Sequence, residues 1–229
     1  MHHRPPRRSR TLPGDGPPDW AEGDTPPAPA EPTTLHAARL QAVEHTLLAS
    51  GARSVADLGC GSGSLALRLL QHPVFERVVG VDLDLARLTA LERAAAASPP
   101  GRLVGVHGAF TFPHGELRGL EAVAMVETLE HVPLQRLSAV EQVVFGHIAP
   151  RVTVITTPNR EFNPLFGMAP GQLREPGHHF EWTRAQFAAW ARAVAARRRQ
   201  VLTLSGIGPA DAMAGTPTQM AVFVPQPAA

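Results

Sequence analysis

Two groups of side chains in this sequence have the types and spacing of a divalent-metal site. The first is Glu127-Thr-Leu-Glu130-His131, which directly follows a short apolar run. On a helical turn, side chains at i, i+3 and i+4 share one face, so these three are expected to converge. The second group is the adjacent pair His178 and His179. Two carboxylates and two imidazoles suit an octahedral divalent ion, and the imidazoles favour manganese over magnesium.

Other interpretations of these side chains stay open at the level of sequence. A Glu-x-x-Glu-His segment is also typical of a solvated helix face. Either His178 or His179 is suited to supply the second imidazole. A structural or solvent-facing role is expected for five scattered histidines, which are His36, His72, His107, His114 and His147.

A glycine-rich turn from Asp57 to Ser64 has the composition of a nucleotide-binding loop. Its glycines, Gly59, Gly61 and Gly63, let the backbone turn tightly and approach a ligand at the carboxyl end of a strand. A dinucleotide fingerprint requires Gly or Ala where this chain has Ser64. The acid before the first glycine instead makes the segment similar to motif I of class I S-adenosylmethionine (SAM) methyltransferases. That resemblance implies that Asp57 holds the amino-acid end of SAM; the alternative is a structural turn with a helix N-cap.

The next expected strand ends at Asp82, whose carboxylate is placed to accept both hydroxyls of a ribose. Asp84 is interpreted as the N-cap of the following helix. Cys60, the single cysteine, is interpreted as a small residue beneath the cofactor. One cysteine also excludes a disulfide scaffold and a multi-cysteine zinc site.

Alternating strand and helix patterns from residue 34 onward are expected to position these groups. Strands are expected at 54–58, 77–82, 102–107, 122–126, 152–156, 201–204 and 220–224. Helices are expected at 35–50, 65–70, 85–97 and 134–148, and from Thr183, where Gln186 completes a capping box. The alternation predicts an α/β protein with a mostly parallel, seven-stranded, Rossmann-like sheet and an antiparallel end strand. The glycine turn and both ligand groups then meet at the carboxyl edge of that sheet.

The amino-acid composition differs between an N-terminal tail, residues 1–33, and the rest of the chain. Residues 1–33 hold nine of the 23 prolines and few large apolar residues, so disorder is expected there and a single domain at 34–229. There is no apolar run of spanning length and no secretory h-region, so a cytoplasmic protein is expected. The net charge of +1 gives no indication for or against nucleic acid. Because the chain has no Lys, any contact from a basic side chain to phosphate comes from Arg.

Three segments, taken in order, closely resemble the small-RNA 3′-terminal ribose 2′-O-methyltransferases, the bacterial branch of the HEN family. They read Glu127-Thr-Leu-Glu-His-Val, Thr156-Thr-Pro-Asn-Arg-Glu-Phe-Asn163 and His178-His-Phe-Glu-Trp-Thr-Arg184. The resemblance extends from about Leu35 to Ala195. It implies a class I SAM methyltransferase fold, SAM and a divalent metal (Mn or Mg) as cofactors, and 2′-O-methylation of an RNA 3′ end with free 2′- and 3′-hydroxyls.

The resemblance also implies roles for individual residues. Its catalytic residues, which are also its metal ligands, match Glu127, Glu130, His131 and His178, with His179 at a position that is usually basic. Cofactor contacts after the third strand match Gly108 and Ala109, where the family often has Gly-Ser. Gly177 stands where the family has Asp, so the orientation of His178 is expected to be less constrained.

The RNA is expected to be held through phosphates and the shape of its end, because nothing in the chain resembles a base-reading module. Arg160 and Arg184 lie in the matched segments and are the favoured phosphate contacts. Asn159 and Asn163 flank Arg160, where they either orient it or contact the ribose; ordinary turn chemistry is the alternative.

Bacterial members that pair with an RNA-repair kinase/ligase carry a long N-terminal half, and here a 33-residue segment precedes the methyltransferase region, so that partnership is not expected. Two other functions fit the same motifs: a class I methyltransferase acting on a small-molecule hydroxyl, or a non-catalytic SAM- or RNA-binding partner protein. A requirement for a vicinal diol on an RNA end distinguishes RNA 3′-end methylation from these.

Overall fold

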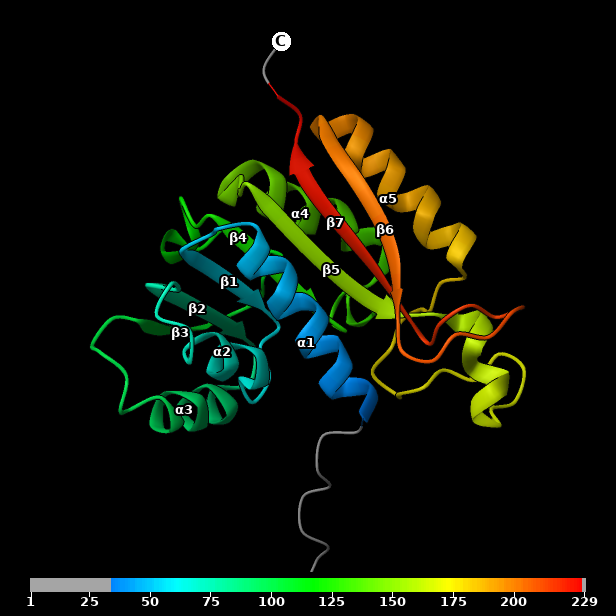
Figure 1. The fold of residues 1–229 in the computed structure, drawn as a ribbon, viewed down its shortest axis with the longest axis horizontal. Coiled ribbons are helices and arrows are strands. Elements are labelled where there is room, and N and C mark those ends of the chain that lie inside the picture. Colours follow the sequence, from blue (N-terminus) through cyan, green and yellow to red (C-terminus); the bar gives the residue numbers. More distant parts are fainter. Residues whose placement is uncertain (1–33, 228–229) are drawn as a thin grey trace, which may run out of the picture. The chain divides into compact units, whose positions relative to one another are not determined.

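The computed structural model describes residues 34–227, and a seven-stranded sheet runs through them (Figure 1). The disorder expected for residues 1–33 concerns residues outside this range. The strand order is β3-β2-β1-β4-β5-β7-β6. The strands are β1 (Ser54–Leu58), β2 (Arg77–Asp82), β3 (Leu103–His107), β4 (Ala122–Val126), β5 (Val152–Pro158), β6 (Gln200–Ile207) and β7 (Thr218–Pro225).

The first five strands pair in parallel, and only β7 is reversed among the strands of this sheet. β7 is antiparallel to both of its neighbours, β5 and β6, so its arrowhead points the opposite way in Figure 1. The expectation of a mostly parallel α/β sheet with an antiparallel end is therefore confirmed. Both closing strands are longer than expected, because they pair without interruption from Gln200↔Pro225 to Ile207↔Thr218.

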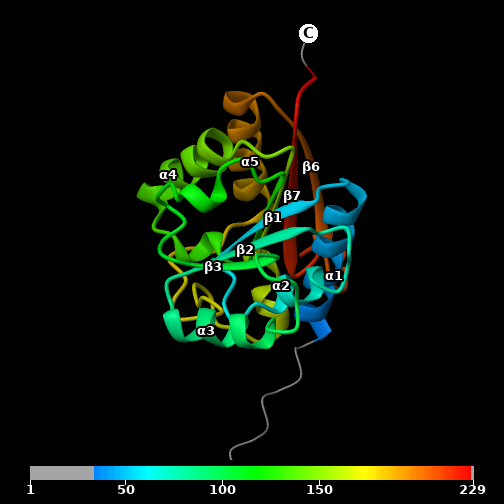
Figure 2. The same ribbon diagram turned by 90° about the vertical axis from the view of Figure 1, so that its left-hand side faces the viewer.

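Helices cover both faces of the sheet, as Figure 2 shows edge-on. One apolar core lies between the sheet and α1 (Thr34–Ala49), α2 (Ser64–Leu69) and α3 (Leu85–Ala94). The other lies beneath α4 (Leu137–Gln142), the π-helix η4 (Val143–Ile148) and α5 (Arg184–Arg198). Successive residues of β4 alternate between the two cores: Ala122 and Ala124 join the first, Val123 and Met125 the second. A strand buried on both faces in this way reads as a continuous apolar run.

The helix expected at 134–148 is divided into three pieces. A 3₁₀ turn, η3 (Leu134–Arg136), precedes α4, and η4 ends at Ala149 in the left-handed region, with φ of 50°. Pro150 disfavours a helical conformation at Ala149, and the Ala149 N–H closes the last turn on the Val144 carbonyl, five residues back.

Local capping signals are confirmed. The Asp84 carboxylate accepts hydrogen bonds from the N–H groups of Ala86 and Arg87 at the start of α3. Thr183 and Gln186 form the predicted capping box of α5. A further 3₁₀ helix, η5 (Arg160–Phe166), lies in a region expected to be loop. Within residues 34–227, no helix is long and apolar enough to cross a membrane.

Candidate active site at the carboxyl edge of the sheet

A cavity of about 470 Å³ opens where the carboxyl ends of the parallel strands meet. Its walls bring together the glycine turn after β1, the end of β2 and the segment after β4. The acidic residues among its lining are Asp57, Asp82, Glu127 and Glu175, and His131 joins them. Two of the four predicted metal ligands, Glu127 and His131, therefore share one cavity with the predicted cofactor residues, whereas Glu130 and His178 are not among its lining residues.

The glycine turn adopts a backbone that suits only glycine. Gly59, Gly61 and Gly63 have φ of 79°, 55° and 83°. A Cβ on Gly59 would lie 2.5 Å from the Thr128 side chain, and one on Gly63 would overlap Leu91. The turn thus presents bare backbone to the cavity and packs tightly beneath it.

We expect Gly63→Ala to destabilise the protein by more than the cost of a left-handed alanine alone, which is about 1–2 kcal/mol. Urea unfolding measures the change. Gly101→Ala is the matched control, because Gly101 has φ of 77° but a Cβ added there would meet no atom within 4 Å. Equal losses in the two variants would show that the overlap with Leu91 has no energetic effect.

Asp57 and Asp82, the two acids predicted to bind a cofactor, both line the cavity. Asp82 accepts hydrogen bonds from the N–H groups of Gly61 (2.7 Å) and Asp84 (2.9 Å), which fix its carboxylate at the end of β2. Asp57 is 2% exposed, and its Oδ2 has no hydrogen-bond partner within the described residues. Burial, with a smaller contribution from Asp82, raises the pKa of Asp57 to about 7. A buried oxygen of this kind suits a cationic group such as an amine.

Gly108 and Ala109, expected to contact the cofactor, follow β3 but are not among the residues that line the cavity. Phe110 lines it in their place. The ring of His114 packs where a Cβ on Gly108 would lie, and His114 Nε2 is 3.0 Å from the Ala109 carbonyl. The His114 side chain therefore packs against this segment, and neither Gly108 nor Ala109 lines the cavity.

Glu127 and Glu130 do not share one helical turn, which corrects the expectation from their spacing. Glu127 has φ of 51°, in the left-handed region, and only Leu129–His131 form a 3₁₀ turn, η2. The Glu127 N–H donates to both the carbonyl and the hydroxyl of Thr156, which extends the β4–β5 pairing by one residue. The chain must then turn sharply, and a non-glycine residue takes the strained conformation.

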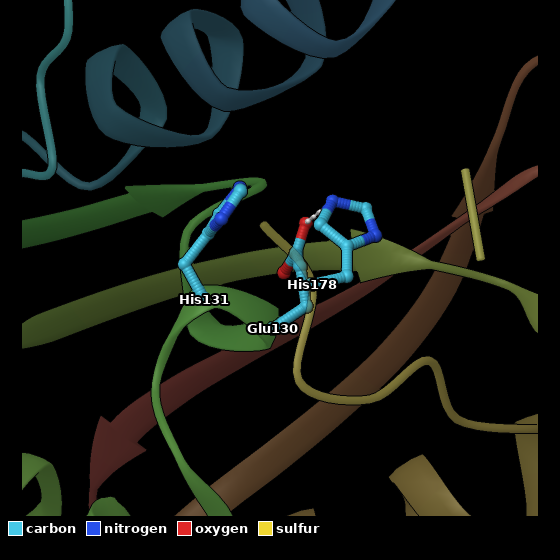
Figure 3. Close-up of side chains that lie close together, drawn as sticks. All are labelled: Glu130, His131 and His178. Carbon is cyan, nitrogen blue, oxygen red and sulfur yellow. Dashed lines mark ion pairs between the residues drawn. The ribbon is translucent and has the colours of Figure 1, made fainter. Parts of the chain in front are cut away.

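Glu130, His131 and His178 nevertheless converge, as Figure 3 shows. Each offers a ligand atom within 4.8 Å of the others. Nε2 of His178 is 3.9 Å from Oε1 of Glu130, and the two imidazole centroids are 4.8 Å apart. His179 is exposed and outside this cluster, and its N–H donates to the Glu130 carbonyl at 2.8 Å, which ties the two segments together.

Glu127 and Glu130 each use one carboxylate oxygen for a protein partner and keep the other unpaired. Glu127 Oε2 is 3.0 Å from the Arg39 guanidinium, and Glu130 Oε2 accepts from the Thr157 hydroxyl at 3.0 Å. The Oε1 atoms of both residues are buried with no hydrogen-bond partner among the described residues. Burial raises the pKa of both carboxyls, and Glu127 raises that of Glu130 further. Two buried, unpaired carboxylate oxygens favour a cation beside them.

The imidazoles of His131 and His178 likewise have one ring atom bound to a protein partner and one without such a bond. His131 Nδ1 is 3.1 Å from the Gly177 carbonyl, and His178 Nδ1 is 2.6 Å from Glu181 Oε1. In each ring, one nitrogen is engaged and Nε2 is left for another ligand. Burial and the neighbouring His178 lower the pKa of His131, so its ring favours the neutral form that binds metals.

A family model described as a methyltransferase domain matches residues 55–151. The small RNA 2′-O-methyltransferase of Rattus norvegicus is 33% identical over 203 residues, which cover 82% of this chain and 50% of that protein. The methyltransferase domain of bacterial CtHen1 is 33% identical, with a TM-score of 0.74 over 83% of this chain and 99% of that domain. This chain belongs to the Hen1 family of small RNA 2′-O-methyltransferases.

A second Hen1-family structure, the small RNA methyltransferase HEN1, is 27% identical, with a TM-score of 0.76 over 84% of this chain and 26% of that one. The chain spans about half the length of the curated relatives it matches. The expected class I methyltransferase fold is confirmed by these comparisons.

Several residues of this Hen1-family site were not assigned from the sequence. Arg39 reaches Glu127 from α1 and donates to the Thr218 hydroxyl at 2.8 Å. Thr157 supports Glu130, and Glu181 supports His178. Nothing in the sequence distinguishes Arg39 from other helical arginines. Glu181, however, lies three residues after His178 in the same matched segment, and this spacing indicates a candidate partner for the imidazole.

The three residues expected to bind RNA occupy different environments in the Hen1-family chain. Arg160 is exposed at the start of η5. Arg184 is paired with Glu161 at 2.7 Å and donates to the Met213 carbonyl. Asn159 is fully buried, which corrects its assignment to the RNA-binding set.

Asn159 instead has the structural role in a turn that was the alternative expectation. Its Nδ2 donates to the carbonyls of Ala214 (2.7 Å) and Thr216 (2.8 Å), and its Oδ1 accepts from the Glu161 N–H to cap η5. These bonds use every donor of the side chain and keep it inside the fold. Asn159 therefore fixes the loop between β6 and β7 to the end of β5.

Proposed function

We propose that this chain methylates the 2′-oxygen of the 3′-terminal ribose of an RNA, with SAM as methyl donor and a divalent ion as cofactor. The observation that carries the proposal is the shared cavity. Asp57 and Asp82 line it together with Glu127 and His131. Membership of the Hen1 family supports RNA as the acceptor.

Two carboxylates support SAM as the cofactor: that of Asp57 has an unpaired oxygen, and that of Asp82 is held by hydrogen bonds. The unpaired Oδ2 of buried Asp57 offers an acceptor for the cationic amino group of SAM. The Asp82 carboxylate, oriented by two backbone N–H groups, retains lone pairs for the two ribose hydroxyls of SAM. Together they would hold the amino group and the ribose of the cofactor and so fix its orientation in the cavity.

The metal half of the proposal is supported by the free atoms of Glu127, Glu130, His131 and His178. Each side chain is held by one protein partner, and each retains one atom able to bind a cation. A divalent ion bound there would polarise the ribose hydroxyls and make the 2′-oxygen a better nucleophile. Arg160, exposed beside the site segments, is suited to a backbone phosphate.

The proposal is tested with radiolabelled SAM, Mn²⁺ and a short RNA prepared with four different 3′ ends. We expect label on the end that carries a free 2′,3′-diol, and none on the 2′-deoxy, 3′-deoxy or 3′-phosphate ends. The labelled RNA should also resist periodate, because a 2′-O-methyl group removes the vicinal diol that periodate cleaves.

Two outcomes would contradict the proposal. Equal labelling of the diol and 3′-deoxy ends would show that the 3′-hydroxyl is not recognised. Absence of label on every RNA, together with methylation of a small catechol, would assign the chain to small-molecule methylation instead.

A further inference from the structure

The imidazole of His178 is held by a buried carboxylate from its own loop. His178 Nδ1 lies 2.6 Å from Glu181 Oε1, and the two side chains are 4% and 0% exposed. The neighbours of Glu181 are both N–H donors: Asn163 Nδ2 reaches its Oε2 at 2.6 Å, and the Arg174 backbone N–H reaches its Oε1 at 2.7 Å. Glu181 therefore accepts on both oxygens, and Nδ1 of His178 must carry the proton of their hydrogen bond.

The orientation of Glu181 is itself determined by Arg174. A guanidinium only donates, and Arg174 Nε donates to Asn163 Oδ1 at 2.7 Å. This contact fixes which end of the Asn163 amide is oxygen, so the NH₂ group faces Glu181. Arg174 Nη2 also donates to the Asn159 carbonyl at 2.7 Å, which anchors the guanidinium to the end of β5. The guanidinium thus orients the amide, the amide orients the carboxylate, and the carboxylate orients the imidazole.

We propose that Glu181 is a positioning residue: it holds His178 as the Nδ1–H tautomer and directs its Nε2 lone pair toward a divalent cation beside Glu130. This inference rests on the proposed function for the nature of the ligand. Nε2 of His178 is 3.9 Å from Glu130 Oε1, an oxygen that has no other partner among the described residues. The two atoms are separated by more than a hydrogen bond, and together with His131 they belong to a group of side chains that could hold one cation.

The arrangement also explains how His178 is oriented without an acid at position 177. Gly177 offers its carbonyl to His131 and has no side chain, and a Cβ there would lie 3.1 Å from His131 Nδ1. A carboxylate three residues after His178 instead supplies the acceptor. A histidine ligand whose second nitrogen donates to a carboxylate is more basic and fixed in orientation, and loss of such a partner costs about 10–100-fold in metal affinity.

The test is a titration of the full chain with Mn²⁺ in the absence of RNA and SAM. Electron paramagnetic resonance measures how much of the Mn²⁺ is bound. In Glu181→Gln, one oxygen becomes an NH₂ group that must face a donor, whichever way the amide is turned. We expect this variant to bind Mn²⁺ about 10–100-fold more weakly than the native protein, with unchanged SAM affinity. Glu181→Asp, which keeps the charge but is shorter, should recover part of the loss.

Glu141→Gln is the matched control. Glu141 is also a buried carboxylate, paired with Arg197 and Arg198 at 2.7 Å on the opposite face of the sheet from α1. Its substitution should lower the thermal unfolding temperature and leave Mn²⁺ affinity unchanged. A purely structural role of Glu181 predicts the same result for Glu181→Gln.

Nitrogen-15 NMR of labelled histidines measures the tautomer of His178 directly, in the native protein and in the variant. In the native protein, His178 should carry its proton on Nδ1, and in Glu181→Gln this tautomer should lose its dominance. An Nε2–H tautomer in the native protein, or native Mn²⁺ affinity in a folded Glu181→Gln protein, would overturn the role of Glu181 alone. A native protein without Mn²⁺ affinity would overturn the proposed metal centre together with this role.

Discussion

Replacement of Glu130 with Gln is expected to abolish detectable methyl transfer while SAM still binds with close to native affinity. The Thr157 hydroxyl donates to Glu130 Oε2 in the native protein. The amide of Gln is uncharged and has one oxygen, so it cannot both accept from Thr157 and offer an anionic oxygen to a cation. Lewis-acid activation is worth several kcal/mol, so a loss of at least about 100-fold is expected in single-turnover measurements with labelled SAM.

The folded state of this variant is also expected to be more stable than the native one at alkaline pH. Burial and Glu127 raise the pKa of Glu130 well above its ordinary value of 4.5. The unfolded chain therefore releases this proton at a lower pH than the folded protein, so the native protein loses stability as the pH rises from the ordinary pKa to the raised one. The uncharged amide of the variant carries no such cost. Glu76→Gln is the control, because Glu76 is an exposed carboxylate paired with Arg53. Retained methyl transfer in Glu130→Gln would show that Glu130 is not a catalytic residue.

Asp57→Asn is expected to stabilise the protein without cofactor and to abolish its stabilisation by SAM. The pKa of Asp57 is about 7 in the folded protein, against an ordinary value of 3.8. The folded state therefore holds this proton more tightly than the unfolded state, and stability is lost between about pH 4 and pH 7 as the carboxyl must ionise. The full penalty above pH 7 corresponds to about 4 kcal/mol.

Urea unfolding at several pH values measures this effect. The free energy of unfolding of Asp57→Asn, relative to the native protein, should increase from pH 4 to pH 8 and then remain constant. A difference that does not change with pH would show that Asp57 is not a buried acid with a raised pKa. In the native protein, SAM affinity should rise through pH 7, because the ionised carboxylate attracts the amino group; the variant should lack this dependence.

The glycine turn and the strands were predictable because their determinants act over a few residues. Gly59, Gly61 and Gly63 each require a backbone that other residues rarely adopt, so their spacing predicts the turn. The apolar runs of β1, β2 and β4 indicate strands buried on both faces, and those strands carry Asp57, Asp82 and Glu127 to one edge. The kinds of side chain at this edge and their meeting place followed from these local patterns.

The same local reasoning was wrong about the conformation between Glu127 and Glu130. Helical spacing predicts one shared face, but the pairing of β4 with β5 continues to Thr156 and holds the Glu127 backbone in place. The constraint comes from a residue 29 positions away, and no pattern within the segment reports it. The assignment of Asn159 failed for a related reason, since its partners lie 55 and 57 residues further along the chain.

The sequence by itself determined which chemical groups this protein brings to the carboxyl edge of its sheet. The tertiary structure decided which atom of each group is free. Arg39 engages one oxygen of Glu127, Thr157 one oxygen of Glu130, and Glu181 one nitrogen of His178. Periodicity and turn chemistry fix the backbone over one or two helical turns, whereas the pairing of a single oxygen depends on side chains that packing brings in from distant segments.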